Sequence, residues 1–452
     1  MNHPSSGAPS SLRELKDAYR PPRVPGPSPD QVRWFRDAKF GMFIHWGLYS
    51  LLGKGEWVLF NERMNIGEYG ALAARFSADE FDPRSWARTA KAAGMQYMVF
   101  TARHHDGFAL FSTKTGTFHG GHSAARRDFV AEYVEACRAE GLKVGLYYSP
   151  MDWRFPGYFF PELYFDDALA MRDQCRNQLR ELMTQYGKID LLWFDGEWLA
   201  HGGISWGPDG WTRRADFSRD ELYFRTNYFW QSEELLAEIR HLQPDILFNN
   251  RFGWEGDFHV RERTIGGLRT DKPWDSNDCL ARSWGWMPGT PLLSLGECIK
   301  NLVSIVVRDG NYLLNVGPTG EGRIEERQEK RLAQVGRWLE QHGKTLYGTR
   351  GGPFPPGDWG GTTYRGRTVF VHILGKAGRI ELRGHFGRLI SFSSPPSTGV
   401  SVIQDQEMVM VLVPPGGHDP WDTIVELQFE SDIVWAGHAA GEDDIYGKAD
   451  GL

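Results

Sequence analysis

Three consecutive segments decide the fold class: MQYMVFTARHHDG (residues 95–107), RDFVAEYVEACRAEG (127–141) and LKVGLYYSPMDW (142–153). The first and third are apolar runs typical of buried strands. The second has the spacing of an amphipathic helix and ends at Gly141. A strand, a helix and a second strand in this order form a βαβ unit, in which the two strands are parallel. These segments therefore predict a parallel sheet.

The same alternation continues on both sides of this unit. Further strands are predicted at KFGMFIHWG (39–47), IDLLWFDGEW (189–198), DILFNNRFG (245–253) and NYLLNVGP (311–318). Further helices are predicted over 81–94, 165–187, 231–243, 291–310 and 323–343, the first with Asp82 as N-cap and Pro83 at its first position. Alternation over about 300 residues predicts a (β/α)8-like TIM barrel rather than an open sheet. There is no GxGxxG or Walker motif at a strand–helix junction, which disfavours a nucleotide-binding fold.

Composition divides the chain into four parts. Residues 1–30 are rich in Pro, Ser and Gly and are expected to be a flexible N-terminal segment. Residues 31–346 contain the predicted catalytic barrel. Residues 347–432 carry short alternating runs such as RTVFVHIL and TIVELQF, which predict a C-terminal antiparallel β-sandwich. Residues 433–452 are expected to be an acidic tail.

The bulk properties exclude several classes of protein. The 452-residue chain has a net charge of −7, which argues against a nucleic-acid binder and, more weakly, against binding to anionic lipid. No apolar run is long enough to span a membrane, and the N-terminus has no signal-peptide core. We therefore expect a cytoplasmic protein, or a periplasmic or secreted one if a leader has been removed; a homo-oligomer is left open. The four scattered cysteines are expected to be reduced core thiols.

Aromatic residues point to the class of ligand. The chain has 18 Trp, and 13% of its residues are aromatic; many of the Trp lie beside Gly, Pro, Asp or His in predicted loops. Loop tryptophans offer an apolar face and a hydrogen-bonding edge, which suits stacking on sugar rings. The alternative is that they simply cover the top of a large barrel.

Polar residues follow the apolar run in six predicted strands, at the carboxyl end of each. They are His45, His104–His105–Asp106, Asp152–Trp153, Asp195, Asn250–Arg251 and Asn315. In a (β/α)8 barrel the carboxyl ends of the strands form the active-site face. No HxH or HExxH motif is present, so we expect these histidines to bind substrate hydroxyls rather than a metal; the alternative is that His104 and His105 are a structural pair.

Glycoside cleavage needs two carboxyl groups, one ionised and one protonated. Asp195 is the candidate for the ionised group, although a lone Asp at a strand end is often only a cap. Trp193 shares its face of the strand, whereas Glu197 lies beyond Gly196 and is expected to support the site from a loop. The candidates for the acid are Glu56, Glu262 and Asp275, in KGEWV, VRERT and KPWDSN.

The ordered motifs resemble one family, the α-L-fucosidases of glycoside hydrolase family 29. The resemblance covers residues 30–350 and rests on KFGMFIHWG, GEW, TARHHDGF, RRDFVAEYVEACRAEGLKVGLYYSPMDW, LLWFDGEW, NNRFG, SWGW and GNYLLNVGPTGEGRI. It implies an exo-acting, retaining hydrolase without a cofactor that acts on a fucosylated oligosaccharide or glycoconjugate. Asp195 would then attack the anomeric carbon. The residues implied to hold the fucose are His45, Glu56, Trp57, His104, His105, Trp193 and Arg251.

One departure from the family pattern concerns the acid. Trp274–Asp275 stands where members of the family usually carry a Glu after the Trp. Asp275 could be the acid on an adjusted loop, which we favour, or Glu262 or Glu56 could serve instead. The chemistry could also be altered, including weak activity or inversion. Two further functions therefore stay open: a carbohydrate-binding pseudoenzyme, and a glycosidase for a related sugar such as α-L-galactose.

Overall fold

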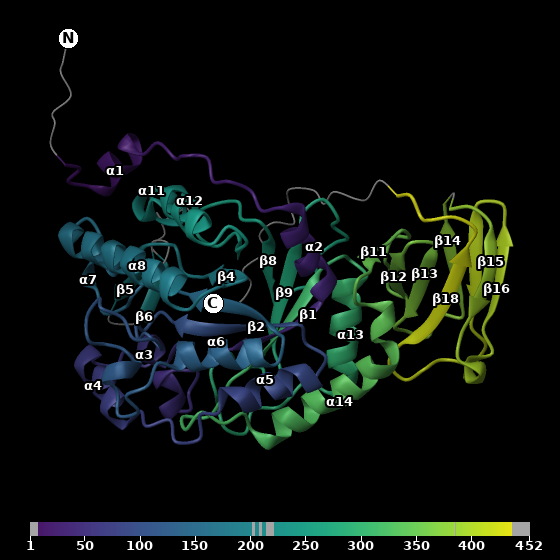
Figure 1. Ribbon diagram of the computed structural model, residues 1–452, viewed down its shortest axis with the longest axis horizontal. Coiled ribbons are helices and arrows are strands. Elements are labelled where there is room, and N and C mark those ends of the chain that lie inside the picture. The colour runs from purple at the N-terminus through teal and green to yellow at the C-terminus, as the bar shows by residue number, and fades with distance from the viewer. Residues whose placement is uncertain (1–7, 201–203, 208–209, 214–220, 385, 436–452) are drawn as a thin grey trace, which may run out of the picture.

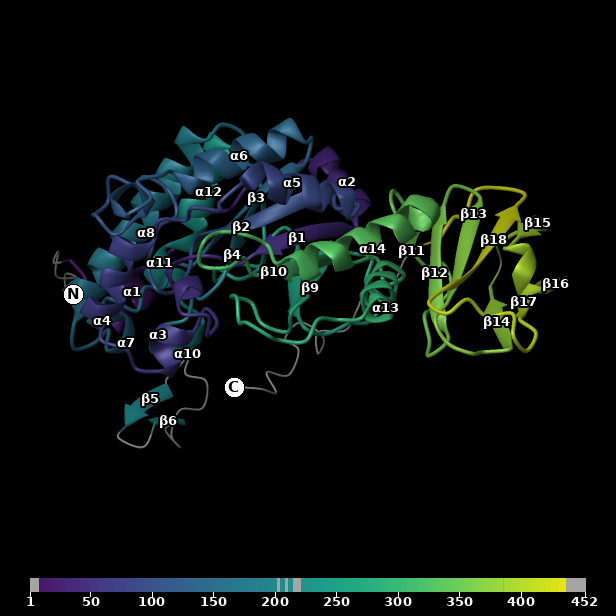
Figure 2. The same cartoon turned by 90° about the horizontal axis from the view of Figure 1, so that it is seen from below.

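The computed structural model describes residues 8–200, 204–207, 210–213, 221–384 and 386–435. It contains a helix-covered barrel and, beside it, an all-β unit built from residues 350–429 (Figures 1 and 2). None of the described helices is long and apolar enough to cross a membrane.

The barrel is an eight-stranded sheet in which every neighbouring pair is parallel. Its strands are β1 (Phe40–Ile44), β2 (Tyr97–Arg103), β3 (Lys143–Tyr148), β4 (Leu191–Phe194), β7 (Leu247–Phe248), β8 (His259–Glu262), β9 (Trp274–Cys279) and β10 (Asn311–Val316). The order β7-β4-β3-β2-β1-β10-β9-β8 is the sequence order around a ring. A parallel bridge between Asn249 and Phe258 links the two ends of the sheet. This confirms the predicted (β/α)8-like barrel.

Long helices cover most of the barrel. They are α5 (Pro83–Ala92), α6 (Phe129–Ala139), α8 (Phe165–Gln185), α12 (Ser232–Leu242), α13 (Leu295–Val306) and α14 (Glu326–His342). The Asp82 side chain caps α5 by accepting from the backbone N–H groups of Arg84 and Ser85, as predicted. Loops 249–258 and 263–273 carry no helix, so β7, β8 and β9 follow one another directly.

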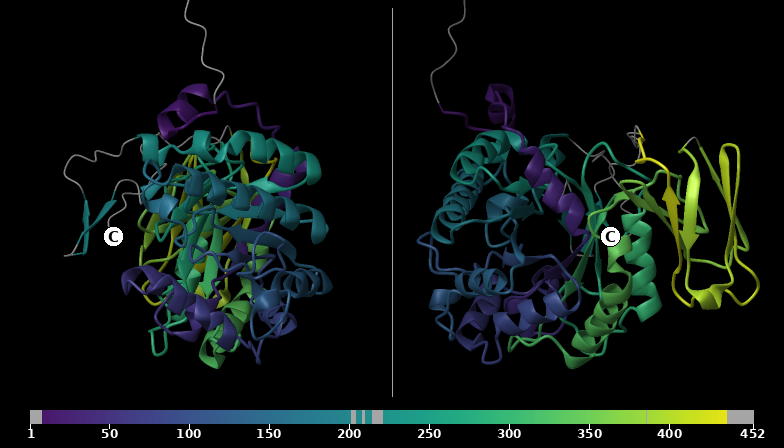
Figure 3. Two further views of the ribbon diagram at one scale, coloured as in Figure 1. Left: turned by 90° about the vertical axis from the view of Figure 1, so that its left-hand side faces the viewer. Right: turned by 45° about the vertical axis from the view of Figure 1, so that its right-hand side comes forward.

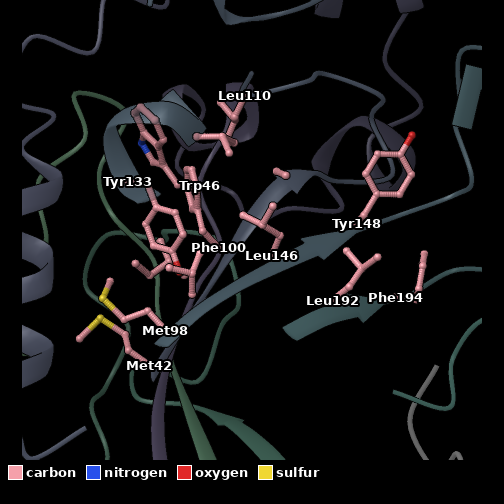
Figure 4. Packing of buried hydrophobic residues seen from close by; sticks show 14 of the residues in the cluster. Met42, Trp46, Met98, Phe100, Leu110, Tyr133, Leu146, Tyr148, Leu192 and Phe194 are labelled. Atoms are coloured by element: carbon pink, nitrogen blue, oxygen red, sulfur yellow. The ribbon is translucent and has the colours of Figure 1, made fainter. Parts of the chain in front are cut away.

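Side chains alternate between the inside and the outside of the barrel wall, as the two-residue period of a strand requires. Outward residues such as Met98, Leu146 and Leu192 pack in the large core shared with the helices, where Tyr133 of α6 also lies (Figure 4). Inward residues form a separate cluster that contains Phe43, Val99, Tyr147, Trp193 and Leu313. A residue that follows the carboxyl end of a strand therefore also faces the barrel interior when it lies two residues after an inward side chain.

Shorter elements surround the barrel. They are α1 (Leu12–Ala18), α2 (Pro29–Ala38), α3 (Val58–Asn61), α4 (Ile66–Gly70), α7 (Pro156–Phe159), α10 (Glu221–Phe224), α11 (Asn227–Trp230) and the hairpin β5 (Ile204–Gly207)–β6 (Gly210–Arg213). The first of these lies on the outside of the barrel against α10 and α11 (Figure 3). The N-terminal segment, predicted to be flexible, thus contains a helix. Residues 436–452, most of the predicted acidic tail, lie outside the described residues.

The C-terminal unit consists of two antiparallel sheets. One has the order β11 (Arg350–Gly351), β12 (Gly360–Arg365), β13 (Thr368–Ile373), β18 (Thr423–Phe429), β15 (Leu389–Ser393). The other has the order β14 (Arg379–Arg383), β17 (Met408–Leu412), β16 (Ser401–Asp405). Side chains from both sheets, including Val371, Ile380, Val411 and Leu427, share one buried core. This confirms the predicted β-sandwich; its boundaries at 347 and 432 remain a prediction.

Candidate active site

Asp195 directly follows β4, on the inward-facing side of that strand. Its Oδ1 accepts a hydrogen bond of 3.0 Å from Arg251 Nη1, and its Oδ2 accepts one of 3.2 Å from the Tyr147 hydroxyl. His105 Nε2 lies 3.7 Å from Oδ2. The Asp195 side chain is 17% exposed, so it is held on several sides and still reaches solvent.

Arg251 joins Asp195 to a second carboxyl group. Its Nη2 donates a 3.0 Å hydrogen bond to Glu262 Oε2, while Nη1 is bonded to Asp195. Since one planar guanidinium makes both contacts, the two bonded carboxyl oxygens lie no more than about 8 Å apart, a bound that includes the spacing of about 5–5.5 Å in retaining glycosidases. The guanidinium carbon lies 5.3 Å from the centre of the Trp193 ring, in a cation–π contact.

Three histidines gather beside this pair. His45 Nδ1 is 2.7 Å from Asn315 Oδ1, and His105 Nδ1 is 2.7 Å from Ser149 Oγ. His104 lies between them, with ring centres 5.5 Å from His45 and 4.1 Å from His105. Burial lowers the pKa of His45 and of His105 to about 3. Neutral imidazoles can each donate and accept one hydrogen bond, which suits sugar hydroxyls.

Glu56 and Trp57 approach from the loop after β1. Glu56 Oε2 accepts a 2.8 Å hydrogen bond from the Gly285 backbone N–H, and burial raises the pKa of Glu56. Trp57 lies edge-on to His105, with ring centres 5.5 Å apart. The Glu56 carboxyl group therefore already accepts a hydrogen bond from Gly285, in the loop that contains SWGW (residues 283–286).

Asp275 lies elsewhere. It is the second residue of β9, four residues before the carboxyl end of that strand, and it is fully buried. Its Oδ2 accepts a 3.2 Å hydrogen bond from Trp193 Nε1, and burial raises its pKa to about 7. The sequence predicted Asp275 on a loop. The structure places it inside the barrel wall because residues 274–279 form a strand.

Several residues of the site were not predicted. Tyr147 and Ser149 contact Asp195 and His105, and their inward positions at the end of β3 could have identified them.

Glu197 was predicted to be a supporting loop residue. Burial raises the pKa of its carboxyl to about 7, and its backbone oxygen accepts hydrogen bonds from the Thr226 hydroxyl and from Trp230 Nε1.

Within the described residues, no group of three or more His, Cys, Asp or Glu side chains could hold a metal ion. The four cysteines are buried and unpaired. The arrangement thus offers two carboxyl groups on one guanidinium, neutral imidazoles and aromatic rings, which is chemistry suited to acid–base and nucleophilic work on a sugar.

Comparison with known proteins supports this interpretation. Residues 11–344 match the family model described as alpha-L-fucosidase. Tissue alpha-L-fucosidase of Bos taurus is 30% identical over 353 residues, which cover 70% of this chain and 69% of that protein. Among solved structures, alpha-L-fucosidase isoenzyme 1 from Paenibacillus thiaminolyticus is similar with a TM-score of 0.71 and 32% identity, covering 89% of this chain and 99% of that one. An alpha-L-fucosidase from Bacteroides thetaiotaomicron has the same fold, with a TM-score of 0.77 at 24% identity over 91% of this chain and 98% of that one.

The match to these enzymes, on a (β/α)8-like barrel with two carboxyl groups at the ends of its strands, identifies the chain as a glycoside hydrolase. Within that class, the chain belongs to the alpha-L-fucosidase family.

Proposed function

We propose that this enzyme removes terminal α-L-fucose from fucosylated oligosaccharides or glycoconjugates with retention of configuration. Asp195 is the nucleophile and Glu262 is the acid/base. The observation that carries the proposal is the pair of 3.0 Å contacts from Arg251 to Asp195 and to Glu262. The Bacteroides thetaiotaomicron protein was trapped as a covalent intermediate in complex with 2-fluoro-fucosyl fluoride, and we propose an intermediate of that kind here.

The reaction takes two displacements. In the first, an Asp195 oxygen bonds to the anomeric carbon while the bond to the leaving oxygen breaks, and Glu262 gives its proton to that oxygen. In the second, Glu262 takes a proton from water, the water oxygen bonds to the anomeric carbon, and the Asp195 ester bond breaks. Glu262 is thereby protonated again for the next cycle.

Arg251 suits both halves of this cycle. Before the first displacement the negative charge is on Asp195; in the intermediate Asp195 is a neutral ester and the charge is on Glu262. Because one guanidinium contacts both groups, its positive charge opposes a single negative charge in either state. No counter-charge has to move during the reaction.

The other candidate acids are less well placed. Glu262 has a side chain that is 41% exposed, so it can meet the oxygen of a leaving group. Asp275 is fully buried inside the barrel. Glu56 is buried and its Oε2 is bonded to the Gly285 N–H. We assign Glu56 to substrate binding, with Trp57 and the histidines at positions 45, 104 and 105. Trp193, predicted to bind the fucose, is buried beneath Arg251 and supports the site from inside the barrel.

The test is hydrolysis of aryl α-L-fucosides, with the anomer of the released fucose followed by NMR. We expect the retained anomer first. Asp195→Ala should abolish turnover. Glu262→Gln should reduce kcat/KM by about 10²–10⁴ with a poor leaving group, and by less with a good one that needs no proton.

Asp275→Asn is the matched control, and it should stay close to the wild type. An inverted product, or a loss in Asp275→Asn equal to that in Glu262→Gln, would contradict the proposed roles. A wild-type protein that binds fucosides without cleaving them would instead be a pseudoenzyme. Faster cleavage of α-L-galactosides would identify a glycosidase for that sugar.

A further inference from the structure

The Trp193 ring contacts Tyr147 and Arg251 through its faces and Asp275, inside the barrel, through its edge. Its face stacks on Tyr147, with ring centres 5.7 Å apart and planes 19° apart, and it lies beneath the Arg251 guanidinium. Both of those residues bond directly to Asp195. The Trp193 ring is therefore packed against two of the donors that hold Asp195.

The indole ring has one polar atom, Nε1, and that atom donates to Asp275 Oδ2 at 3.2 Å. Trp193 and Asp275 are both buried, on strands β4 and β9, which are not neighbours in the sheet. The hydrogen bond therefore crosses the interior of the barrel. This bond holds the edge of the ring that carries the N–H group.

We propose that Asp275 is a positioning residue for the fucosidase reaction, acting through Trp193 on Arg251 and Tyr147 and hence on Asp195. This inference rests on the proposed function. It gives Asp275 a role different from proton donation, because no part of Asp275 has to meet the substrate.

The proposal requires an acceptor oxygen at this position and no particular charge. Burial raises the pKa of Asp275 to about 7, and the oxygen can accept from the indole N–H whether or not the carboxyl is ionised. Among the described residues, Asp275 Oδ1 makes no hydrogen bond, and the Trp193 N–H group is bonded to Oδ2. An amide has the same shape and the same acceptor, and it should serve equally well.

A double-mutant cycle between the two residues tests this. Asp275→Leu keeps the number and branching of the side-chain heavy atoms and removes the acceptor; Trp193→Phe keeps a ring and removes the N–H. We expect Asp275→Leu to lower kcat about tenfold with a change in KM of less than about threefold, since displacement of the nucleophile acts on the transition state. In the Trp193→Phe background the same substitution should change kcat less than about twofold. Asp275→Asn should restore wild-type kinetics over the whole pH profile.

Controls separate positioning from stability. Val369→Ala weakens the sandwich core and should lower the melting temperature without changing kcat per folded molecule. A purely structural Asp275 would behave in the same way, and that result would overturn the proposal. If Asp275→Leu does not fold, Trp193→Phe alone decides: wild-type kcat in that variant would also overturn it. Absence of any wild-type turnover would refute the proposed function instead, so the two failures are distinct.

Discussion

Arg251 is the residue on which the geometry of the two carboxyl groups depends. Its planar fork donates to Asp195 through one nitrogen and to Glu262 through the other. A lysine carries the same charge on a single nitrogen, so it cannot hold two acceptors at fixed separation. Arginine therefore supplies a fixed separation between the two acceptors in addition to its charge.

The first prediction at the residue scale follows from this. Arg251→Lys should lower kcat/KM about 10²-fold, a loss typical of catalytic groups that move by about 1 Å. Steady-state kinetics on an aryl fucoside measures the loss, and circular dichroism checks the fold. Activity within about threefold of wild type would show that a point charge suffices.

The buried histidines give a prediction about pH. Burial lowers the pKa of His105 to about 3 in the folded protein, whereas an unfolded histidine titrates near its ordinary value of about 6.5. Below that value the unfolded chain binds a proton that the folded chain does not, so this residue makes the free energy of unfolding fall as the pH falls.

Between pH 7 and pH 5 the wild type should therefore lose up to about 2 kcal/mol more stability than His105→Gln. Urea unfolding at the two pH values measures the difference. Asp106, whose pKa burial raises to about 6, has the opposite sign and is present in both proteins. Equal pH dependence in wild type and variant would mean that His105 does not lose its proton on folding.

At the scale of elements, the apolar strands of the barrel could be predicted from sequence and the polar ones could not. Six strands are apolar runs, and they were found with ends within a few residues. β8 and β9 were missed because no helix separates them and because β9, WDSNDC, is polar. Its inward side chains, Asp275 and Asn277, break the pattern that identifies a buried strand.

Because β8 and β9 were missed, only part of the candidate site could be predicted from the sequence. Asp195 and Arg251 follow recognised strands, so their place at the mouth could be predicted, and the structure brings them together. Asp275 precedes the carboxyl end of an unrecognised strand, so its depth could not be predicted. The link between Arg251 and Glu262 depends on how the sheet closes, which no local pattern encodes.

The Asp82 cap of α5 gives a prediction at this scale. Its Oδ1 accepts from Arg84 N at 3.0 Å and from Ser85 N at 3.1 Å. Asp82→Ala should lower the free energy of unfolding by about 1 kcal/mol, because two backbone donors lose their acceptor, and Asp82→Ser should recover most of it. Chemical denaturation measures both. Activity should not change, since α5 lies on the outside of the barrel.

At the scale of the whole molecule, a buried ion pair connects the two units. Lys39, immediately before β1, donates a 3.1 Å hydrogen bond to Asp309 Oδ1, and both side chains are almost fully buried. The same oxygen accepts from the backbone N–H of Gly351 in β11. The base of the barrel and the first strand of the sandwich thus share one carboxylate.

Asp309→Ala should destabilise the protein by about 3–5 kcal/mol, because it leaves the Lys39 ammonium buried without its partner. The double variant Lys39→Met/Asp309→Ala should lose less, since the buried charge is gone. Thermal unfolding of the three proteins measures this. A double variant no more stable than Asp309→Ala would mean that the Gly351 contact, and not the ion pair, dominates.

The barrel closes between β7 and β8 through a single parallel bridge. Arg251 follows the first of these strands and Glu262 ends the second, so the ion pair between Arg251 and Glu262 also spans the closure. Local unfolding there would separate Glu262, the proposed acid, from Asp195, the proposed nucleophile, while the rest of the barrel stayed folded. The upper working temperature of the enzyme would then be set by this short closure rather than by global melting, and activity should disappear at a lower urea concentration than helical circular dichroism.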